Sequence, residues 1–167
     1  MYSSKIDPKF NKKQNPKIGL IALASDYIIE KDFINVIQGK EIDFFVNRIE
    51  CFNPLTSENL IKMSKKVTDV TKDILPGEKI DCVVYGCTSG TIAAGYDSIK
   101  DKIKKAKPEA AVTTPSTASI KALKKLNLNK IAIFTPYPKK LNDQVIDFFN
   151  KEKFVITANS YFDISSD

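Results

Sequence analysis

An α/β fold with a parallel sheet and helices on both faces is the class that the sequence predicts. Six short apolar runs alternate along the 167-residue chain with segments of helical periodicity, an order typical of strand–helix units that build parallel sheets. The runs are continuously apolar, as expected for strands that helices cover on both faces. The expected strands cover residues 17–24, 42–49, 80–85, 110–114, 130–134 and 154–158.

Local signals justify the helices in order. Ser25 and Asp26 can cap a helix over 30–38 that ends at Gly39. After Asn53-Pro54 a second helix begins at Thr56, with apolar residues at helical spacing until Pro76-Gly77. Three further helices are expected from about 88 to 107, over 116–126 and over 141–150.

Composition limits the function. A chain with 43% apolar and 28% charged residues can fill a core of one domain, or of one and a half small ones. Absence of histidine excludes histidine triads and histidine-ligated metals, and without a CxxC pair no metal site is expected. The apolar runs are too short to cross a membrane, and residues 1–16 resemble a loose leader rather than a secretory signal. We therefore expect a cytoplasmic protein with no membrane partner.

The net charge of +6 comes almost entirely from lysines, since Arg48 is the one arginine. The densest run, residues 100–107, holds five lysines on a helical pattern without interleaved aromatic residues. Nucleic-acid grooves usually supply arginine forks and stacking platforms. We expect a solvated surface and no nucleic-acid partner; nucleic-acid binding remains an alternative that would show steep salt dependence.

The loop after the third strand carries the chemistry. Cys87 lies where that strand ends and a helix begins, and Gly86 before it permits a tight turn. The amides of Thr88, Ser89 and Gly90 would point out of the helix start, where they favour a bound carboxylate and lower the pKa of a thiol. Such a thiolate could attack or deprotonate a carbon beside the carboxylate, provided that the sulfur is accessible. The alternative is that Cys87 is a small buried residue, as we expect for Cys82 and Cys51.

Several segments resemble the aspartate/glutamate racemase superfamily, and within it the branch of maleate cis-trans isomerases, arylmalonate decarboxylases and the ectoine-utilisation protein EutA. The resemblance covers almost everything from Lys17 onward and is most specific in the block LPGEKIDCVVYGCTSGT. The other segments are GLIALASDYIIEKDF, FFVNRIECFNPLTSENL, VTTPSTASIKAL and KIAIFTPY.

The resemblance implies two similar α/β domains with the active site between them, in homo-oligomers that need no cofactor and no metal. It divides this chain into a first domain over 17–115 and a partial second domain over 116–167. Cys87 matches the first of two catalytic cysteines. The positions implied to bind the carboxylate substrate are Ser25, Asp26, Thr88, Ser89, Thr135 and Tyr137.

The chain departs from the family pattern in two ways. Asp26 stands where many isomerases carry asparagine, and its carboxylate would repel a dicarboxylate unless it is protonated or turned away. No cysteine follows Cys87, and the family's closing helix is also missing, so the chain is either a fragment or a naturally short relative. We expect a cofactor-independent isomerase or racemase that acts on a small carboxylate through Cys87. A catalytically impaired carboxylate-binding module and an arylmalonate-type decarboxylase are the alternatives.

Overall fold

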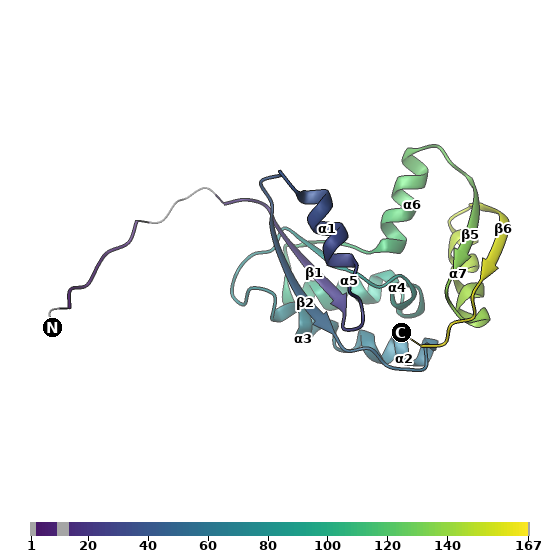
Figure 1. The fold of residues 1–167 in the computed structure, drawn as a ribbon, viewed down its shortest axis with the longest axis horizontal. Helices are drawn as coiled ribbons and strands as arrows, with labels where there is room; N and C mark the ends of the chain where they lie inside the picture. The colour runs from purple at the N-terminus through teal and green to yellow at the C-terminus, as the bar shows by residue number, and fades with distance from the viewer. Residues whose placement is uncertain (1–2, 10–13, 167) are drawn as a thin grey trace.

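The computed structural model describes residues 3–9 and 14–166, and it confirms the α/β fold. Four parallel strands form a first sheet in the order β2-β1-β3-β4, and two more form a second sheet, β5-β6 (Figure 1). The strands are β1 (Lys17–Leu23), β2 (Asp43–Ile49), β3 (Cys82–Tyr85), β4 (Ala111–Thr113), β5 (Lys130–Thr135) and β6 (Val155–Tyr161).

Helices cover the first sheet unequally. Helix α1 (Ile29–Ile37) packs on one face through Ile29 and Phe33, in a small core around Leu20. The larger core lies on the other face, where four helices bury their apolar residues against β1 and β3. These helices are α2 (Ser57–Ser64), α3 (Val67–Lys72), α4 (Thr88–Ala94) and α5 (Tyr96–Ala106).

The second sheet is joined to the first by α6 (Pro115–Lys125) and carries α7 (Lys139–Lys151) (Figure 1). The Gln144 amide nitrogen on α7 donates to Ser57 Oγ at the start of α2 over 2.9 Å. Residues beyond β6 return to the segment between β2 and α2, where the Leu55 N–H donates to the Ser165 carbonyl over 2.7 Å. Thr88, which follows β3, and Thr135, at the end of β5, line one pocket between these parts.

Two expected helices are each split in the structure. The helix from Thr56 is interrupted at Lys65 and Lys66 between α2 and α3. The helix after Cys87 is interrupted at Gly95, whose φ of 82° is a left-handed conformation that glycine adopts without strain. Strand β6 continues to Tyr161, three residues beyond the expected end at 158.

The leader expected over 1–16 lies partly outside the described residues, which omit 1–2 and 10–13. Residues 3–9 and 14–16 form no helix or strand. Among the helices of the described ranges, none is long and apolar enough to span a bilayer.

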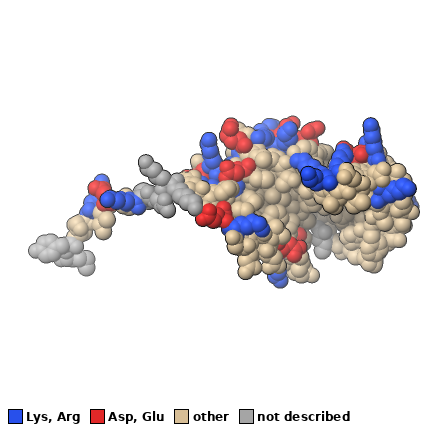
Figure 2. All heavy atoms as spheres, turned by 90° about the horizontal axis from the view of Figure 1, so that it is seen from above, with Lys and Arg blue, Asp and Glu red and all other residues tan. Residues whose placement is uncertain are grey.

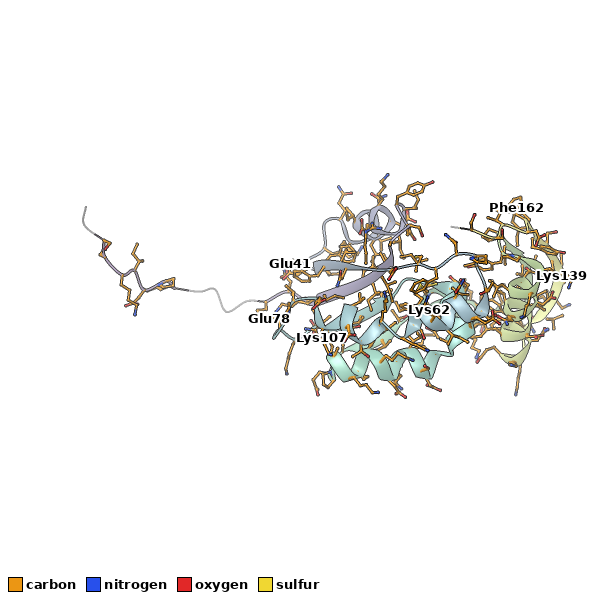
Figure 3. The ribbon with its side chains drawn as sticks, turned by 90° about the horizontal axis from the view of Figure 1, so that it is seen from below. Glu41, Lys62, Glu78, Lys107, Lys139 and Phe162 are labelled. Carbon is orange, nitrogen blue, oxygen red and sulfur yellow. The ribbon has the colours of Figure 1, made fainter. Side chains whose placement is uncertain are left out.

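The lysine run at 100–107 does not act as one exposed surface. Lys107 is buried, and its Nζ donates to the carbonyls of Leu75 and Glu78 over 2.8 Å each. Figure 3 shows Lys107 and Glu78 together on the side of the molecule from which the N-terminal segment extends, away from Lys139 and Phe162. On the face seen in Figure 2, basic and acidic side chains are interspersed.

Candidate active site

Cys87 is the N-cap residue of α4, as the sequence predicts. Its backbone is extended, with φ of −123° and ψ of 113°, and its Sγ accepts the backbone N–H of Gly90 over 3.2 Å. Ser89 Oγ lies 3.8 Å from the same sulfur. A hydrogen bond donated to sulfur favours the charged thiolate, whereas burial favours the neutral thiol.

The sulfur is closed off from solvent in this structure. Cys87 is 3% exposed and belongs to the larger core together with Tyr85. The accessible sulfur that an attacking thiolate requires is therefore not what the structure shows. This low exposure supports the alternative interpretation, in which Cys87 is a small buried residue.

Glycines on either side of Cys87 allow close packing. A Cβ on Gly90 would lie 2.7 Å from Tyr85 Oη and 2.8 Å from Cys87 Sγ, so no larger residue fits without displacing them. A Cβ on Gly86 would lie 3.1 Å from the Ile21 carbonyl oxygen and 2.8 Å from Ile29 Cδ1. Gly86 is thus needed for close approach to β1 and α1, rather than for the tight turn that we expected.

Tyr85 is an additional polar group beside the cysteine that the sequence analysis did not single out. It is fully buried, and its hydroxyl has no well-formed hydrogen bond within the described residues. Burial raises the pKa of the phenol, and the neighbouring Cys87 raises it further. The hydroxyl therefore stays protonated and remains a hydrogen-bond donor.

In the loop after β1, the carboxylate of Asp26 is hydrogen-bonded to the backbone, whereas Ser25 is exposed to solvent. Asp26 Oδ1 accepts the N–H groups of Ile28 and Ile29, over 2.8 and 2.9 Å, so the carboxylate is occupied at the start of α1. Ser25 is exposed, and its Oγ lies 3.6 Å from the sulfur of Cys51 at the end of β2.

Arg48 holds this loop and was missed by the sequence analysis. Its Nη1 donates to the carbonyls of Leu23, Ala24 and Asp26 over 2.9, 3.3 and 2.6 Å. Its Nη2 pairs with Glu30 on α1 over 2.9 Å. The one feature of the sequence that could have indicated this role is that Arg48 is the only arginine and lies in a strand next to β1.

The end of β5 contributes a second group of residues. Thr88, Thr135 and Tyr137 line one pocket of about 340 Å³, so the structure brings these three expected site residues together. Ser25 and Asp26 do not line this pocket. Thr135 is buried, and its hydroxyl donates to Asn142 Oδ1 over 2.9 Å. Asn142 lies on α7 and is fully buried, and the sequence does not predict it as a site residue.

The other two cysteines differ in their surroundings. Cys82 lies in the small core near α1, where burial raises the pKa of its thiol and the nearby Lys121 opposes that shift. Cys51 is half-buried and packs against the same core as Cys87. Within the described ranges, no cluster of three or more acidic or cysteine side chains could hold a metal ion.

Solved structures share this arrangement of strands and helices. The maleate isomerase of Pseudomonas putida S16 matches 90% of this chain with a TM-score of 0.78 at 20% identity. A maleate cis-trans isomerase of Nocardia farcinica, solved as a cysteine-to-serine mutant with a covalently bound succinylcysteine intermediate, matches with a TM-score of 0.79 at 19% identity. A liganded mutant of arylmalonate decarboxylase matches with a TM-score of 0.74 at 21% identity. This chain has the maleate isomerase fold.

The maleate isomerase fold is represented here only in part. The chain spans 65% of the length of each of the two isomerases and 63% of that of the decarboxylase mutant, while 90% of its own residues are matched in each case. This agrees with the expected incomplete second half, which in this structure is the two-stranded sheet with α7. No protein-family model matches the chain, and no curated protein matches it significantly.

Proposed function

We propose that the chain belongs to a cofactor-independent isomerase that acts on a small cis-dicarboxylate through Cys87. The observation that carries the proposal is the position of Cys87 at the junction of β3 and α4, with the Gly90 N–H directed at its sulfur over 3.2 Å. The fold shared with maleate isomerases supports the same chemistry, and the covalent succinylcysteine seen in one of them supports addition by sulfur.

The proposed reaction needs no external electrons. The Cys87 thiolate adds to one carbon of the double bond, and the π pair moves onto the adjacent carboxylate. Rotation about the new single bond follows, and the electron pair then returns to re-form the double bond in the trans geometry and release the thiolate. Thr88 and Tyr137, which line one pocket, would bind the carboxylates and stabilise the developing charge. We further propose that the protein is a cytoplasmic homo-oligomer. Because the sequence also resembles the ectoine-utilisation branch, small carboxylates of ectoine breakdown are additional substrates to assay.

Proton NMR of maleate incubated with the protein tests the proposal. We expect fumarate to accumulate with the wild type and not with Cys87→Ser, whereas Cys82→Ser should retain turnover. A Cys87→Ser variant as active as the wild type would exclude this role for the sulfur. Circular dichroism and sedimentation of each variant would confirm an unchanged fold and report the oligomeric state.

A carboxylate-binding module without turnover is the second candidate. The 3% exposure of Cys87 favours it. Calorimetry with maleate and malonate separates the two, since saturable heat without product by NMR supports binding alone. A decarboxylase is the third candidate, supported by the fold shared with arylmalonate decarboxylase, and release of carbon dioxide from a phenylmalonate would identify it.

A further inference from the structure

The hydroxyl of Tyr85 is buried but makes no hydrogen bond that would stabilise the fold of the described residues. Tyr85 is 0% exposed, and its hydroxyl is one of two buried side-chain polar groups without a hydrogen-bond partner in the described ranges. A buried hydroxyl without a partner costs free energy relative to an apolar group of the same shape. Phenylalanine would fill the same space without that cost, so the oxygen requires another explanation.

The sulfur of Cys87 is the polar group next to that oxygen. Both atoms adjoin the same small volume, because a Cβ added to Gly90 would lie 2.7 Å from Tyr85 Oη and 2.8 Å from Cys87 Sγ. Glycine at position 90 leaves this volume empty of carbon and also donates its own N–H to the sulfur. The sulfur therefore has the Gly90 amide, the Ser89 hydroxyl and the Tyr85 phenol beside it.

The electrostatics favour a donor role for the phenol. Burial and the adjacent cysteine both raise the pKa of Tyr85, so the hydroxyl keeps its proton when the sulfur is charged. A neutral hydroxyl is a poor partner for a neutral thiol but a good one for a thiolate, since hydrogen bonds to charged groups are the stronger ones.

We propose that Tyr85 is a positioning residue for Cys87: its hydroxyl donates a hydrogen bond to the thiolate, stabilises the charged form and directs it from the end of β3. The proposal rests on the proposed function of Cys87 as the nucleophile. It assigns Tyr85 no contact with the substrate. The Tyr85 hydroxyl then acts on the charged sulfur together with the Gly90 amide and beside the Ser89 hydroxyl.

The test is the ionisation of Cys87 in Tyr85→Phe, measured by peptide-resolved alkylation with iodoacetamide across a range of pH. We expect the midpoint of the Cys87 profile to move upward by about one pH unit. Tyr96→Phe is the matched control, because the Tyr96 hydroxyl donates to the Val112 carbonyl over 3.0 Å. It should leave the midpoint unchanged. An unchanged midpoint in a folded Tyr85→Phe would overturn the proposal.

A second measurement does not depend on alkylation. The difference in thiolate ultraviolet absorbance between each protein and the same protein carrying Cys87→Ser, followed as the pH is raised, gives the ionisation midpoint of Cys87 directly. Burial of the sulfur and the hydrogen bonds that it accepts act on this midpoint in opposite directions, so the deciding comparison is between the wild-type and the Tyr85→Phe backgrounds. Equal midpoints in the two backgrounds would also overturn the proposal. Neither measurement uses a substrate. Failure of the NMR turnover assay with a shifted midpoint would therefore refute the proposed function and leave the role of Tyr85 standing.

Discussion

Arg48 donates a 2.6 Å hydrogen bond from Nη1 to the carbonyl oxygen of Asp26. The same guanidinium nitrogen also reaches the carbonyls of Leu23 and Ala24, so one side chain from β2 holds the whole turn that leaves β1. The loop that carries Ser25 is thus shaped by a residue more than twenty positions away in the chain.

Replacing Arg48 with alanine should destabilise the protein by about 1–3 kcal/mol, because three carbonyls lose a charged donor at a half-exposed position. Urea unfolding followed by circular dichroism measures the change. Lys31→Ala, at an exposed site on α1, is the control and should change the free energy of unfolding by less than about 0.5 kcal/mol. Equal stability of Arg48→Ala and wild type would show that the hydrogen bonds contribute nothing.

Gly90→Ala should destabilise the protein, against the usual preference of helices for alanine over glycine by about 0.5–1 kcal/mol. The new Cβ would lie under 3 Å from both Tyr85 Oη and Cys87 Sγ. We expect a loss of about 1–3 kcal/mol in thermal or urea unfolding, typical of an overpacked core. A more stable variant would contradict this prediction and would mean that the neighbouring side chains rearrange at little cost to make room for the new Cβ. Asp97→Ala, at an exposed position on α5, serves as the control.

Thr135 and Asn142 should behave as a coupled pair. Thr135→Val leaves Asn142 Oδ1 without its donor, and Asn142→Leu leaves the Thr135 hydroxyl without its acceptor. Each single variant should cost about 1–3 kcal/mol. The double variant should cost less than the sum, with a coupling energy of about 1 kcal/mol in a double-mutant cycle of unfolding free energies. Strict additivity would argue that the hydrogen bond does not form.

Cys82 should react slowly with iodoacetamide at neutral pH. Burial penalises its charged form and raises the pKa of the thiol, so the reactive thiolate appears only at higher pH. Because Lys121 lowers that pKa, Lys121→Ala should slow the reaction of Cys82 further. Lys125→Ala, at the end of the same helix, is the control. Faster reaction of Cys82 in Lys121→Ala would contradict the assigned direction.

The raised pKa of Cys82 also has a consequence for stability. A thiol that ionises less readily when folded than when unfolded binds more protons in the native state. The free energy of unfolding should therefore fall as the pH rises above the ordinary thiol value, and Cys82→Ala should reduce this fall. Urea unfolding on both sides of that pH measures the difference. If the free energy of unfolding of Cys82→Ala depended on pH in the same way as that of the wild type, the fall would be due to groups other than Cys82.

The sequence by itself determined the order of strands and helices and the place of Cys87 at a helix start. These features depend on apolar periodicity, prolines and caps within a few residues, so local patterns contain them. The capping role of Asp26 is of the same kind, since its carboxylate accepts from residues two and three positions later.

Only the tertiary structure decided how the site is enclosed. Arg48 reaches the first loop from another strand, Asn142 meets Thr135 across a helix–strand contact, and Tyr85 acquires its place beside Cys87 through the gap at Gly90. Cys87 likewise lies in a core shared with residues of α2 and α5, far from it in the chain. Such properties arise from contacts between residues brought together by folding, and no local pattern carries them.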